Sequence, residues 1–222
     1  MSLECSEAEI QEAREVLSPD ETSRAERFYF ERDRRAFIAV RGTLRQLLGR
    51  YLGRSPAEFA FSYGTYGKPS LREEFASIPV HFNVSHSRGL ALLAFSLGRE
   101  LGVDLEYVRA DIASEEIAER YFSSREVAEL LSLAQSQRAE GFFLCWTRKE
   151  AYVKAIGNGL QIPLKSFSVG LTRSEPERIE SADHERWALR SLRPASAFVG
   201  AIVAEGRDWQ LRCWEQTPRR VP

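Results

Sequence analysis

Two acidic residues near the middle of this sequence have the types and spacing of a metal site. Asp104 and Glu106 are separated by one residue in VDLE, so in a strand both carboxylates project from one face. Neighbouring carboxylates repel each other, and one takes up a proton unless a cation lies between them. Oxygen ligands alone favour Mg²⁺ or Mn²⁺, often shared with substrate phosphates. Taken alone, the pattern is more often two solvated acids on an edge strand.

Glu150 and Lys154 lie four residues apart in CWTRKEAYVKAI, where a helix is expected. On a surface helix such a pair contributes only about 0.2–0.5 kcal/mol. This segment is too apolar all round for a surface helix, because it contains Phe142, Phe143, Leu144, Trp146, Tyr152, Val153 and Ile156. Charged groups on a buried helix need partners. A third carboxylate and an ammonium beside Asp104 and Glu106 would complete a site for Mg²⁺ and a polyphosphate.

Two further segments offer groups that bind anions. In HFNVSHS, His86 lies between Ser85 and Ser87, but a serine–histidine nucleophile is disfavoured because neighbours on a strand point to opposite faces. A structural histidine capped by hydroxyl groups is favoured, and a phosphate-binding histidine is the remaining alternative. The turn TYGKP presents Lys68 beside exposed backbone N–H groups, an arrangement that often holds an anion.

The elements that must position these groups follow from periodicity. Apolar residues spaced by three and four predict helices at residues 7–17, 20–53, 112–140 and 139–156. Gly53 is expected to end the second of these, and SSRE has the spacing of a capping box. The runs of strand type are FAFSYGTYGKP, PVHFNVSHS, ALLAFSL, LGVDLEYV, FSVGL, RWALRSL, AFVGAIVAE and WQLRCW.

The order of helices followed by strands occurs twice along the chain. We therefore expect an α+β fold of two similar halves, residues 1–107 and 108–222, which form one compact unit. No internal sequence repeat is strong enough to show this division by itself.

The composition limits the class of protein. A formal net charge of −1 argues against a general nucleic-acid binder. No run approaches the roughly 18 apolar residues that span a membrane, and the first residues lack the order of a signal peptide, so a cytoplasmic protein is expected. Cys5, Cys145 and Cys213 are far apart and form no CxxC pair, which predicts reduced thiols and neither a disulfide nor a zinc site.

The order and spacing of YGKP, FNVSHS, LGVDLE and WTRKEAYVKAIGNGL resemble the 4'-phosphopantetheinyl transferases of the surfactin-synthetase-activating (Sfp) type. Their signature is a GVD-x-E strand followed by W-(S/T)-x-K-E-(A/S)-x-x-K, and the resemblance covers essentially the whole chain. It implies the fold of that family, in which two similar α/β halves are related by a pseudo-twofold and the site lies at their interface. It also implies a monomer that transfers the phosphopantetheine arm of coenzyme A to a serine of apo acyl or peptidyl carrier proteins, releasing adenosine 3',5'-bisphosphate.

The resemblance implies roles for the four residues considered first. Asp104, Glu106 and Glu150 would hold Mg²⁺, or Mn²⁺, together with the coenzyme A diphosphate. Lys154 would neutralise charge on the same diphosphate. Glu150 is also the candidate base for the carrier serine, so Asp104, Glu150 and Lys154 are the candidate catalytic residues.

Other positions match the coenzyme A contacts of the family. Arg24 and His86 match positions that bind the 3'-phosphate, Ser85 belongs to the same coenzyme A-binding set, and Lys68 matches a position against the adenine nucleotide. Glu126 matches an acidic position that is sometimes counted with the metal site.

Two neighbouring positions are less well defined by the resemblance. Glu21 stands where a second basic contact to the 3'-phosphate is expected. Lys149, next to Glu150, should point elsewhere on the helix, toward the carrier protein or the surroundings of the helix.

Two other functions use the same residues. One is a metal-dependent nuclease or phosphatase, and the other is a non-catalytic relative that binds coenzyme A or a carrier protein. The intact set of Asp104, Glu106, Glu150 and Lys154 argues against the second. The sequence does not identify the carrier, although the arginine-rich segment 24–54 is a candidate surface for an acidic carrier helix.

Overall fold

Local signals define where the helices begin and end. The computed structural model describes residues 1–65, 67–75, 77–157, 162–172 and 177–216. Its α-helices are α1 (Glu7–Glu15), α2 (Pro19–Glu26), α3 (Glu31–Leu52), α4 (Glu115–Tyr121), α5 (Ser124–Ser132) and α6 (Gln135–Ile156). Ser123 and Glu126 form the predicted capping box of α5, and Gly157 ends α6 with a positive φ of 79°. The rest of the GNGL motif lies outside the described residues.

Among the described residues, the strand pairs are antiparallel and fall into four small sheets. The strands are β1 (Phe61–Tyr63), β2 (Pro69–Leu71), β3 (Val80–Ser87), β4 (Leu90–Leu97), β5 (Leu101–Tyr107), β6 (Ser168–Val169), β7 (Ile179–Glu180), β8 (Trp187–Leu192) and β9 (Phe198–Glu205). β1 pairs with β2, β3 with β4 and β6 with β7, while the remaining three form a sheet in the order β5-β9-β8. Short 3₁₀ helices lie at Pro56–Glu58, Glu73–Phe75, Leu164–Ser166 and His184–Arg186.

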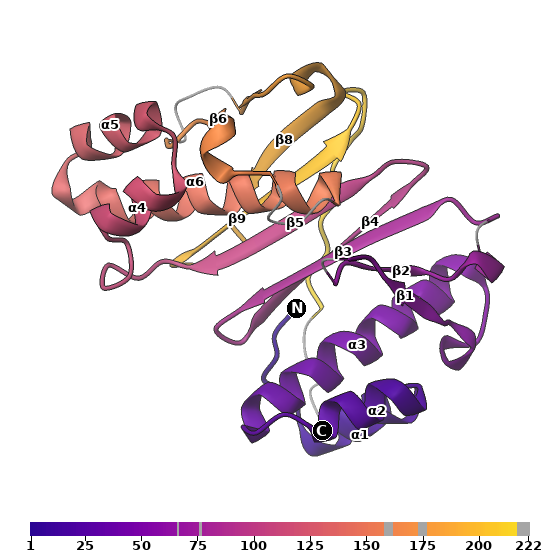
Figure 1. Ribbon diagram of the computed structural model, residues 1–222. Coiled ribbons are helices and arrows are strands. Elements are labelled where there is room, and N and C mark those ends of the chain that lie inside the picture. Colours follow the sequence, from indigo (N-terminus) through magenta and orange to yellow (C-terminus); the bar gives the residue numbers. More distant parts are fainter. Residues whose placement is uncertain (66, 76, 158–161, 173–176, 217–222) are drawn as a thin grey trace.

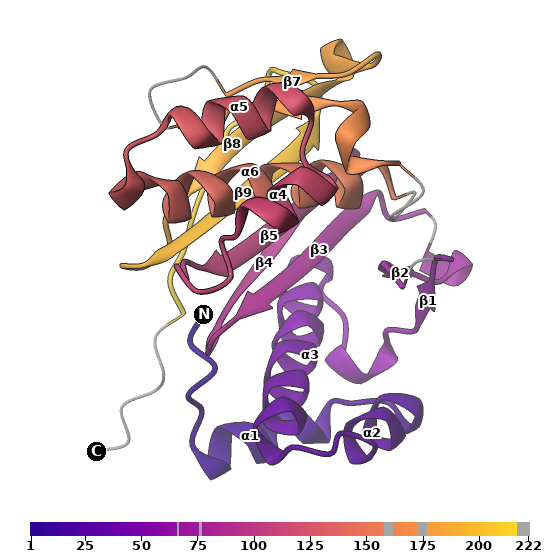
Figure 2. The same ribbon diagram turned by 60° about the vertical axis from the view of Figure 1, so that its left-hand side comes forward.

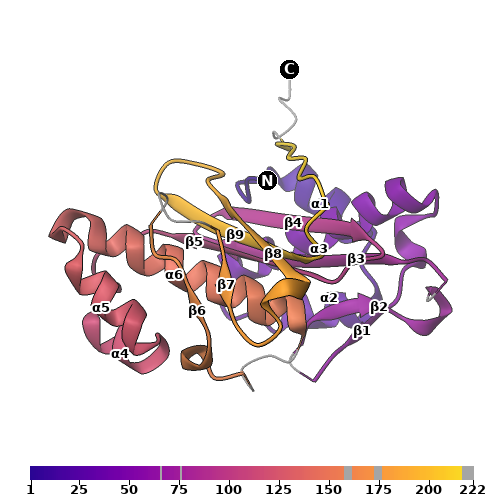
Figure 3. The ribbon, with the colours of Figure 1, turned by 90° about the horizontal axis from the view of Figure 1, so that it is seen from above.

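Two long helices organise the apolar cores. Leu44 and Leu48 of α3 pack with Phe82 of β3 and with aromatic residues of the segment between them, so α3 covers one face of the β3–β4 hairpin (Figures 1 and 2). α6 covers the β5-β9-β8 sheet, and α4 and α5 lie beside its first turns (Figure 3). The fold is therefore α+β, as the sequence predicts.

β5 lies between the β3–β4 hairpin, covered by α3, and the remainder of the β5-β9-β8 sheet, covered by α6. The two strands predicted around residues 98–100 are present as β4 and β5, but β5 pairs with β9, from Leu101 opposite Ala204 to Tyr107 opposite Phe198. The last strand of the predicted first half thus makes its backbone hydrogen bonds within the second. The division near residue 108 stays a prediction.

Three secondary-structure predictions are wrong. The helix predicted at residues 112–140 is α4 and α5 followed by the first turns of α6, which begins at Gln135, because the backbone is extended at Phe122 and Leu133. The helix predicted at residues 20–53 is two helices, because α2 packs on α3 and the chain must change direction between them; Phe30 is extended, with φ −93° and ψ 130°. WQLRCW is not a strand, and both edges of β9, the strand before it, are already occupied by β5 and β8. The alternating segment WQLRCW therefore cannot pair with either edge of β9.

Among the described residues, no helix has the length and apolar character needed to cross a bilayer. The three cysteines are free, as predicted. Burial raises the pKa of the Cys145 thiol well above its usual value, and the nearby Glu126 carboxylate acts in the same direction. Cys145 is therefore an unreactive core residue.

Candidate active site

The site is built where α6 crosses β5. Gly102 permits this contact, because a Cβ at that position would overlap the Ala151 carbonyl oxygen and the Ala155 amide nitrogen of α6. The backbone of the helix therefore lies directly against the strand. This close packing brings Lys154 of α6 beside Asp104 of β5.

Lys154 and Asp104 form the central ion pair. Nζ of Lys154 donates to Asp104 Oδ1 at 2.6 Å, and to Ser85 Oγ and the Val103 carbonyl oxygen at 3.3 Å each. Ser85 Oγ donates to the same carboxylate oxygen at 2.9 Å. Ser85, expected to contact coenzyme A, thus has its hydroxyl proton committed to Asp104.

The second oxygen of Asp104 has no donor. Asp104 is 5% exposed, and its Oδ2 is buried without a hydrogen-bond partner in the described part of the chain. A buried acceptor left unsatisfied costs about 1–3 kcal/mol, and more when it is charged. Oδ2 therefore marks a position where a cation is stabilised.

Glu106 and Glu150 add negative charge at this position. Burial and the charge of Asp104 raise the pKa of Glu106, and the hydrogen bond from Ser87 partly offsets both effects. Burial, Asp104 and Glu106 raise the pKa of Glu150, against the lowering effect of Lys154. Three carboxylates thus act against Lys154 and, at Glu106, also against Arg109, which leaves an excess of negative charge.

This donor set fits a divalent cation. As the side chains lie, no three His, Cys, Asp or Glu residues within the described ranges are close enough to hold a metal ion together, and Lys154 occupies one oxygen of Asp104. A bound cation would nevertheless satisfy the unpartnered Asp104 Oδ2 and lower the raised pKa values of Glu106 and Glu150. Oxygen ligands of this kind are those that Mg²⁺ takes.

His86 lies on the other face of β3 from Ser85. Partial burial and the positive charge of Lys154 lower the pKa of its imidazole below the usual 6.5. The ring is therefore neutral at pH 7. A neighbouring phosphate would favour its protonated form.

Arg24 has a partner that the sequence did not reveal. Its guanidinium lies 5.3 Å from the centre of the Phe37 ring and 5.8 Å from that of Tyr63, and Arg41 lies over the same two rings at 5.8 and 5.7 Å. Nη1 of Arg41 is buried without a hydrogen-bond partner among the described residues. Arg24 and Arg41 together make a cationic cluster suited to an anion.

Glu21 is buried between α2 and α3 and is paired with arginines. It is 1% exposed and accepts from Arg45 Nε at 2.7 Å, with Arg41 Nε at 3.4 Å from its other oxygen. A buried carboxylate needs such cations. Glu21 therefore holds α2 against the arginines of α3.

Lys68 directly precedes β2, and its side chain reaches the beginning of β5. Its Nζ donates to Glu100 Oε2 at 2.9 Å and to the Leu101 carbonyl oxygen at 3.0 Å, and His81 lies 3.0 Å from the other oxygen of Glu100. Tyr66 of the YGKP motif lies outside the described residues. The ammonium expected to face the adenine nucleotide is thus already paired with Glu100, which the sequence did not indicate.

Comparison with known proteins shows the family. Residues 2–97 match the family described as 4'-phosphopantetheinyl transferase, N-terminal, and residues 100–203 match the 4'-phosphopantetheinyl transferase superfamily. The 4'-phosphopantetheinyl transferase HetI of Nostoc sp. is 42% identical over 208 residues, which cover 94% of this chain and 86% of that protein. The chain belongs to the 4'-phosphopantetheinyl transferase family.

A second curated relative agrees with this assignment. The 4'-phosphopantetheinyl transferase Sfp of Bacillus subtilis is 31% identical over 195 residues, covering 87% of this transferase-family chain and 84% of Sfp. Among solved structures, the holo-[acyl-carrier-protein] synthase of Thermotoga maritima matches with a TM-score of 0.38 and 21% identity, covering 49% of this chain and 63% of that one.

Glu126, the remaining acidic candidate of this 4'-phosphopantetheinyl transferase family member, lies in a separate cluster. It is fully buried, 2.8 Å from Lys149 Nζ, and accepts from the amides of Ser123 at 2.7 Å and Val169 at 2.8 Å. Lys149 is fully buried as well, so it contacts the surroundings of the helix and not a carrier protein. Both residues are structural.

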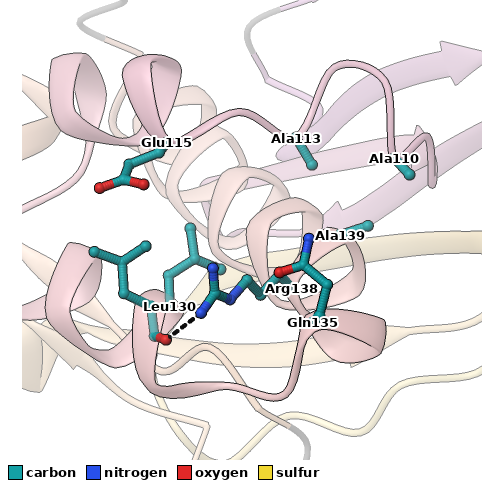
Figure 4. Close-up of a pocket in the computed structure, with 8 residues that line it drawn as sticks. Ala110, Ala113, Glu115, Leu130, Gln135, Arg138 and Ala139 are labelled. Atoms are coloured by element: carbon teal, nitrogen blue, oxygen red, sulfur yellow. Dashed lines mark hydrogen bonds between the residues drawn. The ribbon is translucent and has the colours of Figure 1, made fainter.

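A surface hollow of about 250 Å³ lies at the first turns of α6, lined by residues of α5, α6, the segment after β5 and the start of α4 (Figure 4). Arg138 closes one side by donating to the Leu131 carbonyl oxygen at 2.7 Å. None of the three site carboxylates lines it. The charged site described above is therefore distinct from this hollow.

Proposed function

We propose that the protein transfers the 4'-phosphopantetheine arm of coenzyme A to a serine hydroxyl of apo acyl or peptidyl carrier proteins and releases adenosine 3',5'-bisphosphate. The observation that carries this proposal is the convergence of Asp104, Glu106, Glu150 and Lys154, with one carboxylate oxygen left without a donor. The relatives named above support the same activity.

The four residues have separate tasks in this reaction. Asp104 Oδ2, Glu106 and Glu150 would hold Mg²⁺ against the coenzyme A diphosphate, where the ion supplies Lewis acidity. Lys154 neutralises charge on the diphosphate while its ammonium also contacts Asp104. Both effects are electrostatic, and positioned charges of this kind supply most of the rate enhancement in phosphoryl transfer.

Glu150 is the proposed base. Its raised pKa makes it a better proton acceptor than an ordinary carboxylate. The carrier serine oxygen forms a bond to the phosphorus that bears pantetheine, and its proton passes to Glu150 directly or through water. The bond from that phosphorus to the bridging oxygen breaks, and adenosine 3',5'-bisphosphate leaves with the electron pair.

The 3'-phosphate is assigned to Arg24 and His86, with Arg41 next to them. Arg24 and Arg41 share the Phe37 and Tyr63 rings, so a phosphate bound to Arg24 also feels the charge of Arg41. Lys68 would reach the nucleotide only by sharing its bond to Glu100.

Coenzyme A binding near pH 7 is expected to take up a proton at His86. The imidazole is neutral in the free protein because its pKa is lowered, and a phosphate dianion beside it raises that pKa. Calorimetric titrations in buffers of different ionisation enthalpy measure the uptake. The uptake should disappear in His86→Gln and with 3'-dephospho-coenzyme A; an unchanged uptake in His86→Gln would exclude this assignment.

The decisive experiment is intact-protein mass spectrometry of an apo acyl carrier protein incubated with this protein, Mg²⁺ and coenzyme A. A mass gain of one phosphopantetheine arm that EDTA abolishes supports the proposal. Absence of the gain with fatty-acid, polyketide and peptide-synthetase carriers contradicts it. Release of inorganic phosphate without modification would indicate a hydrolase that uses the same carboxylates.

We also propose that the protein acts as a cytoplasmic monomer. Every carboxylate and the ammonium of the site come from one chain, on β5 and α6, so no second copy is needed to complete it. Light scattering at the concentration used for the assay tests this, and an active dimer would contradict it.

A further inference from the structure

Side chains on one face of β3 accept the backbone hydrogen bonds along one edge of β5, where a paired strand would normally lie. The N–H groups of Val103, Leu105 and Tyr107 donate to the side chains of Asn83, Ser85 and Ser87 at 2.8, 3.2 and 3.2 Å. β5 has its other edge paired with β9. Because buried backbone donors must be satisfied, these three side chains do for β5 what strand pairing does elsewhere.

Within the described part of the chain, each of the two serines also donates a hydrogen bond to a carboxylate, which Asn83 does not. Ser85 Oγ donates to Asp104 Oδ1 and Ser87 Oγ donates to Glu106 Oε2, each at 2.9 Å. A hydroxyl group has a single proton, and an amide N–H can only donate. The amide of β5 therefore occupies each serine as an acceptor, and the serine proton is directed at the carboxylate.

The hairpin turn sets the position of Ser87. It is the last residue of β3, opposite Leu90, and a two-residue turn with positive φ at Arg88 (44°) and Gly89 (82°) follows it. The Arg88 guanidinium lies 5.6 Å from the centre of the Tyr107 ring on β5. The tip of the hairpin is thus fixed against the end of the strand that carries Glu106.

We propose that Ser87 is a positioning residue that orients the Glu106 carboxylate for the divalent cation. This inference rests on the proposed function, in which Glu106 is a metal ligand. The glutamate side chain is flexible, but the Ser87 hydroxyl binds Oε2 of Glu106. This hydrogen bond fixes the direction in which Oε1 points. Removal of a hydrogen-bond partner of a metal-ligating group commonly weakens metal binding about 10–100-fold.

The test is Mn²⁺ binding, followed by electron paramagnetic resonance with coenzyme A present and without any carrier protein. Ser87→Ala is expected to raise the Mn²⁺ Kd about tenfold, while Ser87→Thr, which keeps the hydroxyl, restores it. With the carrier added, the loss of rate in Ser87→Ala should diminish as Mn²⁺ is raised.

Asn83→Ala is the matched control. It removes a side-chain acceptor from β5, as Ser87→Ala does, but no bond to a carboxylate. It should lower the melting temperature and leave the Mn²⁺ Kd unchanged. An unchanged Kd in Ser87→Ala, an equal rise in Asn83→Ala, or no Mn²⁺ binding by the wild-type protein overturns the inference.

Failure of the proposed function gives a different result. Wild-type protein that binds Mn²⁺ in a Ser87-dependent manner, yet modifies no carrier, would contradict the transferase proposal and leave the role of Ser87 intact. Wild-type protein that modifies the carrier, with Mn²⁺ binding insensitive to Ser87→Ala, would do the reverse.

Discussion

Replacement of Glu150 by glutamine is expected to lower kcat/KM for arm transfer by about two to three powers of ten, because loss of one charged group from an electrostatic site costs about 3–4 kcal/mol of transition-state stabilisation. Glutamine keeps the shape of the side chain but removes both the negative charge and the proton acceptor. The modified carrier, quantified by mass spectrometry over time, gives the rate.

The same variant should fold at least as stably as the wild type at pH 7. Burial and the neighbouring carboxylates raise the folded-state pKa of Glu150 above its usual 4.5, so the folded protein binds this proton more tightly than the unfolded chain. Ionised Glu150 therefore destabilises the folded state, and the penalty grows as pH rises through the window above 4.5. The melting temperature of Glu150→Gln minus that of the wild type should increase over this window.

Glu140→Gln is the control for both measurements. Glu140 lies on the same helix, where it pairs with Arg193 at the surface, so its replacement should leave the transfer rate unchanged. A wild-type rate in Glu150→Gln would remove Glu150 from the site. Unfolding of that variant at pH 7 would contradict the electrostatic argument.

Replacement of Lys149 by methionine is expected to lower the free energy of unfolding by about 3–5 kcal/mol, because it leaves the buried Glu126 charge without a cation. Lys149 Nζ also donates to the carbonyl oxygens of Leu164 at 2.7 Å and Phe167 at 2.6 Å, which joins α5, α6 and the segment before β6. Urea unfolding measures the change. Lys165→Met, at an exposed position, should have little effect.

A double variant separates charge from packing. Adding Glu126→Gln to Lys149→Met removes the unpaired charge. Ser123 and Val169 donate to different oxygens of Glu126, so the single oxygen of the glutamine keeps only one of these two backbone donors, a smaller loss than an unpaired buried charge. We expect the double variant to be more stable than Lys149→Met alone. If the two are equally unstable, the loss comes from packing and the buried ion pair is not its cause.

Three consecutive residues of α6 show why the partners of its charged side chains could not be predicted from local sequence patterns. Arg148 donates to the carbonyl oxygens of Gly170 and Thr172, Lys149 pairs with Glu126, and Glu150 faces the site. Successive residues of a helix point about 100° apart, so each reaches a different neighbour. The apolar character of the segment predicted that these charges need partners, and the structure supplies a separate partner for each.

The sequence by itself determined the local features: most helices and strands, the capping box at Ser123, the glycine that ends α6, and the paired spacing of Asp104 with Glu106. These depend on residues within a few positions of each other, where periodicity and capping preferences act. The family signature rests on the same short motifs.

The family resemblance placed Asp104 and Lys154 at one site, but only the tertiary structure shows which charges pair directly. Asp104 and Lys154 are far apart in the sequence, and they pair because β5 joins β9 and Gly102 lets α6 approach the strand. Glu126 has the same chemistry as Glu150 but pairs with Lys149 in the core. Ser87 appears as a partner of Glu106 only when the hairpin lies beside β5. Such contacts between distant residues depend on sheet pairing and helix packing, which no local pattern encodes.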